Sequence, residues 1–233
     1  MNLTIEEVYI MKKEKLVTVE SFYKKWGVKF TFNHTGKMEN MISLSTCCQS
    51  NDHCKEHAKV PGSICEKCYA QRMLNNKFYN NLKKVLENNY KILTSVIIPV
   101  DEWPIINAAA FRIEAFGDVD NEIQAINYFN FCTKNKQIPW AAAWTKNPLI
   151  FDNVIKAGHK KPKNLNIGIS SILLNTVAKI DAFPWCDFVF TVYDPDYIKE
   201  HDITINCGAL LCIGCLKCYK KHKGVIYINE MLK

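Results

Sequence analysis

The chain has 233 residues, of which 48% are hydrophobic and 23% are charged, and its formal net charge at pH 7 is +7. This composition suits one domain with a sizeable core and excludes a disordered or fibrous protein. The longest apolar runs, 93–100 and 167–174, are too short to span a bilayer, and residues 1–15 lack the apolar stretch of a secretory signal. We therefore expect a cytoplasmic protein with no membrane partner.

Arginine is scarce among the basic residues. Of the 30 lysines and arginines, only Arg72 and Arg112 are arginines. Because base reading and phosphate clamping usually use the bidentate arginine fork, the charge favours a solvated lysine surface over a nucleic-acid interface. The segment 217–223, which holds four lysines beside the last cysteine, supports the alternative of nucleic-acid binding.

Expected helices and strands alternate through the middle of the chain. In chain order they are a helix over 70–89, a strand over 109–114, a helix over 121–133, a strand over 140–145, a helix over 148–157, and strands over 165–170 and 187–193. The helices carry apolar stripes of period 3.6, and the strands are short and rich in β-branched or aromatic residues. Each strand is followed by a helix-like stretch, which is typical of βα units.

The predicted fold class is α/β, a single domain of repeated βα units over residues 1–233. Residues 1–40 form an N-terminal extension in this prediction, and residues 41–230 form the core. Nearly continuous apolar strands indicate a parallel sheet covered by helices. We expect a complete or partial βα barrel with cysteine clusters near both ends of the chain, and a doubly wound open sheet is the alternative.

Polar residues follow the expected strands, where both architectures place their ligand site. We predict catalytic roles for Arg112, Glu114, Asp118, Lys146 and Ser170, and cofactor contacts for Gly117, Thr145 and Asn147. Arg112 lies inside an apolar strand, where an unpaired charge is costly. The alternative to a substrate contact is an ion pair of Arg112 with Glu114 or Asp118 that orders the barrel.

Eleven cysteines point to metal ligation. An odd number in a chain without a secretory signal argues against a disulfide framework. Nine of them form two groups, and the other two, Cys132 and Cys186, have helix-like or apolar surroundings that predict core thiols. The C-terminal group is Cys207, Cys212, Cys215 and Cys218, whose short spacers let the thiolates turn toward one iron-sulfur or zinc centre.

The N-terminal group is Cys47, Cys48, Cys54, Cys65 and Cys68. Four of these five suffice for a second centre, with Cys47 or Cys48 left over. His53 and His57 offer imidazole ligands as alternatives, although solvated histidines are the commoner case in such a polar loop. Two arrangements stay open: one metal centre in each group, or one zinc-ribbon-like site that combines Cys65 and Cys68 with Cys212 and Cys215.

The stretch 58–70, AKVPGSICEKCYA, resembles the bacteriophage family known as gene product eighty-eight. Further segments agree in order over roughly residues 41–230: Arg112 with Gly117 and Asp118, then 144–147, then 164–170, then the terminal cysteine run and a closing strand over 224–228. The chain departs from the family pattern at Glu114, Ala115 and Phe116. The resemblance implies a fold, the cysteines as cluster ligands and a host-cytoplasm location for a phage protein, but no reaction.

A βα barrel with cysteines after its first strand also resembles radical S-adenosylmethionine enzymes. That resemblance implies a 4Fe-4S cluster on three cysteines, with one iron open to S-adenosylmethionine. The usual C-x3-C-x2-C spacing is absent, and Cys54, Cys65 and Cys68 would be an expanded version. We therefore expect an iron-sulfur enzyme with one or two 4Fe-4S clusters and an unidentified small-molecule or nucleic-acid substrate. Zinc is the alternative metal, and nucleic-acid binding and electron transfer are the alternative functions.

Overall fold

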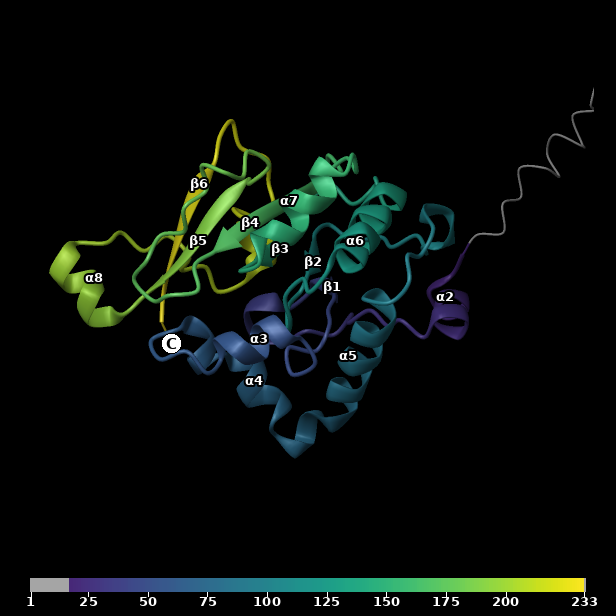
Figure 1. Cartoon of the computed structure of the whole chain (residues 1–233), viewed down its shortest axis with the longest axis horizontal. Coiled ribbons are helices and arrows are strands. Elements are labelled where there is room, and N and C mark those ends of the chain that lie inside the picture. Colours follow the sequence, from purple (N-terminus) through teal and green to yellow (C-terminus); the bar gives the residue numbers. More distant parts are fainter. Residues whose placement is uncertain (1–16, 233) are drawn as a thin grey trace, which may run out of the picture.

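The computed structural model describes residues 17–232, and its centre is one six-stranded parallel sheet (Figure 1). The strands are β1 (Ile42–Leu44), β2 (Phe111–Ile113), β3 (Ala141–Thr145), β4 (Leu165–Ser170), β5 (Phe188–Tyr193) and β6 (Ile226–Met231). They follow one another across the sheet in chain order, β1 to β6. A doubly wound sheet reverses its strand order at a switch point, so the double winding of that alternative is wrong, although β1 and β6 are unpaired edges of an open sheet among the described residues. Winding in one direction is the arrangement of βα barrels.

The predicted strands are confirmed, and one strand was missed. β1 has three residues, too few to show a period, and its register comes from pairing with β2, with Ser43 opposite Arg112. The predicted closing strand over 224–228 begins at Ile226 and continues to Met231.

Two predicted helices are confirmed on one face of the sheet. α6 (Glu122–Lys134) is capped at its N-terminus by Asn121, whose side chain accepts a hydrogen bond from the backbone N–H of Gln124. α7 (Pro148–Lys156) begins with proline in its first turn. Both helices pack against alternate strand residues such as Ile113 and Ile167, which are fully buried. This layer is the main hydrophobic core.

The predicted helix over 70–89 is wrong as one element. The chain forms α4 (Tyr69–Leu74), the short helix η3 (Lys77–Tyr79) and α5 (Asn80–Leu93). The Asn76 side chain accepts from the backbone N–H of Phe78, which starts a new turn and breaks the helix. Phe78, an apolar residue within the predicted helix, is 83% exposed as a result.

The connection from β4 to β5 differs from the predicted βα unit, because residues 171–187 contain no helix. Ala178, Ile180 and Phe183 of this segment pack against the main core instead. A segment of turns and irregular structure therefore covers the sheet where a helix was expected.

Residues 17–40, expected as an extension, are part of the domain. They contain α2 (Val19–Trp26) and η1 (Gly36–Met38), and they add Phe22, Val28 and Phe30 to the main core. The remaining elements are α3 (Asp52–His57), η2 (Ile64–Lys67), η4 (Val100–Glu102), α8 (Pro195–His201) and α9 (Cys212–Cys215). None of the helices within 17–232 has the length and apolar character needed to cross a bilayer.

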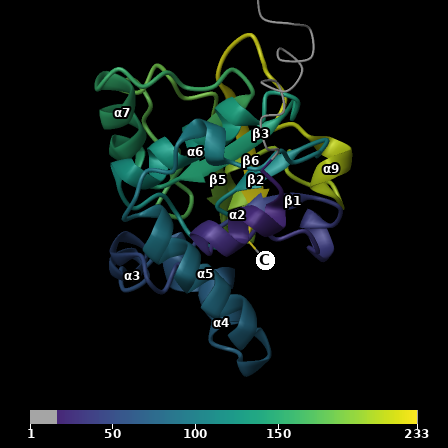
Figure 2. The same ribbon diagram turned by 90° about the vertical axis from the view of Figure 1, so that its right-hand side faces the viewer.

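The opposite face of the sheet is covered by the C-terminal segment 206–222. Leu216 and Tyr219 pack on Ala142, whose neighbours Ala141 and Ala143 point to the other face. Figure 2 shows α9 near β1, and α9 contacts η1, which precedes that strand. The segment therefore lies across the inner face of a curved sheet, where a complete barrel would hold its packed interior.

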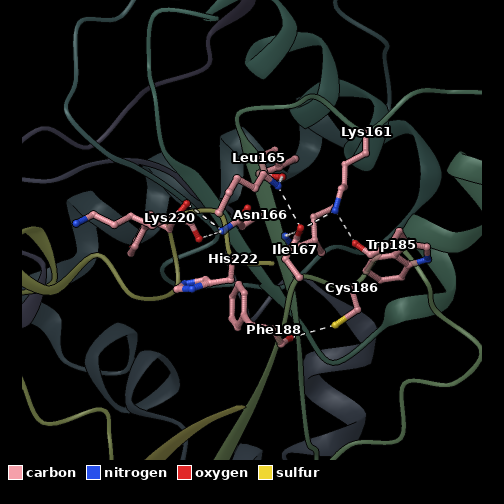
Figure 3. Close-up of polar contacts among 12 residues, drawn as sticks. Lys161, Leu165, Asn166, Ile167, Trp185, Cys186, Phe188, Lys220 and His222 are labelled. Carbon is pink, nitrogen blue, oxygen red and sulfur yellow. Dashed lines mark hydrogen bonds and ion pairs between the residues drawn. The ribbon is translucent and has the colours of Figure 1, made fainter. Parts of the chain in front are cut away.

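Asn166 on β4 anchors this segment (Figure 3). Its side-chain amide donates to the carbonyls of Cys218, Tyr219 and Lys220 at 3.1, 2.9 and 2.8 Å. Two positions along β4, Gly168 leaves room for a ring of β5, since an added Cβ would lie 2.0 Å from Phe188. The buried Asn166 amide therefore holds the C-terminal segment close to β4. The absence of a side chain at Gly168 lets β5 approach β4 closely.

Candidate metal and substrate site

The N-terminal cysteine group lies at the carboxyl edge of the sheet. Cys47 and Cys48 come three and four residues after Leu44, the last residue of β1, and both are buried. Asn51 accepts from the backbone of Cys54 to start α3, while its amide donates to the carbonyl of Asp118 at 3.0 Å. This side chain fixes α3 and Cys54 beside the end of β2.

The same loop continues across the sheet toward β4. Ser63 forms an antiparallel bridge with Leu173, and the Ile64 N–H donates to the Ile172 carbonyl at 2.8 Å. Cys65 lies in η2, directly after this contact, and Cys68 precedes α4. The five N-terminal cysteines therefore belong to one loop that covers the carboxyl ends of β1 to β4.

Glu114 is buried behind this loop rather than exposed to a ligand. Its carboxylate accepts from the Thr46 backbone at 3.0 Å, the Thr46 hydroxyl at 2.8 Å and the Gln124 amide at 2.8 Å, and also from the Tyr128 hydroxyl. Burial raises the pKa of Glu114 to about 7, although the hydrogen bonds from Tyr128 and Thr46 oppose the rise. Glu114 has a left-handed backbone, with φ 55°. Through its hydrogen bonds, Glu114 fixes the position of Thr46, the residue before Cys47.

Gly117 packs against the same network. A Cβ at this position would lie 2.7 Å from Glu114 Oε2 and 2.8 Å from Thr46 Oγ1, so only glycine fits without a shift. The structure therefore gives Gly117 a packing role where the sequence suggested a cofactor contact.

Asp118 joins the ends of β2 and β3. It is buried, and its carboxylate accepts from the backbone of Val119 and of Lys146, both at 2.7 Å. Thr145, also buried, accepts from the Asn147 backbone at 2.8 Å and so shapes the turn into α7. The side chains of Asp118 and Thr145 therefore hold the backbone in place where it leaves β2 and β3. Ser170 ends β4 as a buried residue.

Lys146 brings positive charge to the N-terminal group. Burial raises the pKa of Cys54 and of Cys65, and the Lys146 ammonium opposes both rises. The same ammonium contributes to the lowered pKa of Cys68. The Cys48 thiol interacts with Cys68 and, as the largest cause, lowers the pKa of Cys68 to about 6, while the pKa of Cys48 rises. The group therefore contains one thiol that ionises readily near neutral pH.

The C-terminal cysteine group lies on the inner face. The Cys207 N–H donates to the Asn229 carbonyl of β6 at 3.0 Å, and Cys212 and Cys215 are the ends of α9. Burial raises the pKa of Cys207 and Cys212 and raises that of Cys218 to about 12. Lys37 donates to the Cys207 sulfur at 3.2 Å, which supplies charge that favours a thiolate there.

Arg112 does not form the ion pair that the sequence allowed. Its guanidinium lies over the Trp144 ring at 3.3 Å, and its Nε donates to the backbone carbonyl of Glu114 at 3.2 Å. The Glu114 and Asp118 carboxylates take the other donors described above. Burial raises the pKa of Cys212 and Cys218, and the positive charge of Arg112 opposes that rise, which indicates that Arg112 lies near the C-terminal group.

Metal ligation by these groups needs a further rearrangement of side chains. All eleven cysteines are free, and within 17–232 no three His, Cys, Asp or Glu side chains have metal-binding geometry. The thiols of each group are nonetheless close enough to shift one another's pKa values. Thiolates are the soft ligands that iron-sulfur and zinc centres take. Cys68 packs in one hydrophobic cluster and Cys212 in another, so these two ligands of the predicted zinc-ribbon arrangement lie in different clusters. Cys132 and Cys186 are core thiols, as predicted.

Several contributing residues gave no clear signal in the sequence. Thr46, Gln124 and Tyr128 complete the Glu114 network, and Lys37 and Glu230 approach the C-terminal group from opposite ends of the chain. Only the position of Gln124 and Tyr128, four residues apart on α6, could have suggested a shared partner.

Comparison with known proteins adds no family. No family model matches the chain, and neither a curated protein nor a solved structure matches it.

Proposed function

We propose that this chain is an iron-sulfur enzyme of the radical S-adenosylmethionine-like type, with its reactive cluster on the N-terminal cysteine group. One observation carries the proposal. Five cysteines lie in a loop directly after β1 that covers the carboxyl ends of a parallel sheet wound in chain order. This edge is where βα folds bind and transform their ligands.

Three thiolates of this loop, Cys54, Cys65 and Cys68, would hold the cluster, with Cys47 or Cys48 as a fourth ligand or a free thiol. A 4Fe-4S cluster on three protein ligands keeps one iron open and supplies single electrons to a bound cofactor. The ammonium of Lys146 offsets the negative charge of the thiolates, while Asp118 holds the Lys146 backbone in place. Arg112 is the candidate contact for an anionic substrate group, since it has no carboxylate partner among the described residues.

The C-terminal group would hold a second centre, either a cluster or zinc. Its four cysteines, half-buried with Lys37 beside Cys207, suit a closed site with four thiolates. Because it lies on the inner face and not at the strand ends, its proposed role is to fix the C-terminal segment to the sheet.

Nucleic-acid binding is less well supported by the contacts of its lysines. Lys217 and Lys221 donate to the carbonyls of Asn206 and Leu165, and Lys220 lies over the ring of Trp140. Of the four lysines in 217–223, Lys223 alone makes no such contact among the described residues. A surface that contacts phosphates needs its cations unengaged.

The test is anaerobic purification of the full chain, followed by analysis of iron, sulfide and zinc. Thiolate-bound iron gives a brown protein with iron and sulfide in about equal amounts, whereas zinc is colourless. The proposal then requires cleavage of S-adenosylmethionine by the dithionite-reduced protein. Two reversible redox steps without cleavage would favour electron transfer, and a colourless zinc protein would rule out the cluster.

Cysteine variants locate the reactive cluster. Cys65→Ala should remove iron and abolish cleavage, and Cys215→Ala should reduce total metal while some cleavage persists. Cys186→Ala, which changes a core thiol outside both groups, is the matched control and should keep all metal. Equal metal loss in Cys186→Ala would mean that folding, not ligation, controls metal content.

A further inference from the structure

Two histidines on α3 form a pair that the cysteine chemistry does not use. His53 and His57 are four residues apart, which places them on one face of the helix. Their ring centroids are 4.3 Å apart with an interplanar angle of 66°. The sequence favoured solvated histidines in this loop, but both side chains are partly buried.

One ring nitrogen of each histidine is buried and unsatisfied. Within the described residues, neither His53 Nε2 nor His57 Nδ1 has a hydrogen-bond partner. A buried polar atom left without a partner costs about 1–3 kcal/mol, so two adjacent ones call for an explanation. The edge-to-face ring contact explains the packing of the rings and leaves both nitrogens unused.

We infer that His53 Nε2 and His57 Nδ1 bind one divalent metal ion of the zinc class. Histidines at i and i+4 on one helix face are a recurrent zinc-binding arrangement, and imidazole suits zinc, nickel and copper. Water would complete the coordination sphere, entering past the exposed parts of the two side chains, because the nitrogens themselves are buried. Near His53, the negative charges of Asp118 and Glu56 favour a bound cation, whereas the positive charge of Lys146 disfavours one.

This metal site is distinct from the proposed cluster because it needs no thiolate. It lies beside the N-terminal cysteine group, since Cys54 follows His53 directly in α3. The inference therefore does not depend on the proposed function, and iron content separates the two in the same samples.

The experiment uses the full-length protein with its native metal content, equilibrated with zinc chloride and freed of excess zinc. Zinc and iron are measured, and zinc X-ray absorption distinguishes nitrogen ligands at about 2.0 Å from sulfur ligands at about 2.3 Å. The test variant is His53→Gln with His57→Gln. The matched control is His159→Gln with His201→Gln, which changes two exposed histidines.

The expected result is the loss of one zinc per chain, and of the nitrogen signal, in the His53→Gln, His57→Gln variant alone, with iron unchanged. Unchanged zinc with sulfur ligands only would overturn the inference. A parallel loss of iron would also overturn it, because the imidazoles would then belong to the cluster. If the double variant does not fold, the nitrogen signal of the wild type and its loss in the single variant His57→Asn decide the question.

Discussion

Lys37 and Glu230 join the two edges of the sheet. The Lys37 ammonium lies 2.7 Å from Glu230 Oε1, although the residues are 193 positions apart in the chain. Lys37 belongs to η1, before β1, and Glu230 belongs to β6, the opposite edge. Since the two edge strands are not paired with each other in the described sheet, this ion pair and the C-terminal segment close the gap that further strands fill in a complete barrel.

Breaking this ion pair should loosen the closure. Lys37→Met leaves the Glu230 carboxylate, whose side chain is 23% exposed, without its partner, and we expect a loss of about 2 kcal/mol in the free energy of unfolding. Glu20→Gln is the control, because its pair with Lys24 is exposed and should contribute less than about 0.5 kcal/mol. Urea denaturation measures both, and equal effects would mean that the Lys37 pair does not hold the edges together.

Glu114 should make the protein less stable as pH rises toward neutrality. Its folded pKa of about 7 lies above the ordinary 4.5, so the stability that the protonated form provides is complete below pH 4.5 and is lost as pH rises through 7. The raised pKa corresponds to about 3 kcal/mol. Glu114→Gln should remove this part of the slope in a plot of unfolding free energy against pH. An unchanged slope, matching that of a Glu20→Gln control, would contradict the burial argument.

Gly117→Ala should disturb the N-terminal cysteine group without touching a thiol. The new methyl group would meet Glu114 Oε2 and the Thr46 hydroxyl within 2.8 Å, which forces the chain before Cys47 to shift. We expect a destabilisation of about 1–3 kcal/mol and a fall in bound metal. Gly224→Ala is the matched control, since nothing lies within 4 Å of its added Cβ. Full metal content in Gly117→Ala would show that the Glu114 network does not position the cysteines.

Gly168 and Phe188 should be energetically coupled. Gly168→Ala places a methyl group 2.0 Å from the Phe188 ring, so we expect a cost of about 3 kcal/mol. In the double variant Gly168→Ala, Phe188→Leu, the smaller leucine side chain removes the clash. The loss of unfolding free energy in the double variant should therefore be smaller than the sum of the two single losses by about 1 kcal/mol or more. A double-mutant cycle in urea measures this coupling, and additive costs would contradict the close approach of β4 and β5.

Local patterns in the sequence were enough to predict much of the fold. Periodicity predicted α6, α7 and the strands β2 to β5, because each buries one stripe or both faces of a short apolar run. Cysteine spacing divided the thiols into two groups. The same local reasoning failed at β1, which is too short to show a period, and at residues 76–78, where an asparagine side chain outcompetes the helix.

The tertiary structure decided the features that depend on contacts between distant residues. Strand order, the closure by Lys37 and Glu230, and the burial of Glu114 against Thr46 and Tyr128 follow from packing across the sheet. A sequence shows which side chains could carry charge or bind metal. Whether Glu114 faces a ligand or a buried network depends on which atoms surround it, and those atoms come from segments that the chain brings together only when it folds.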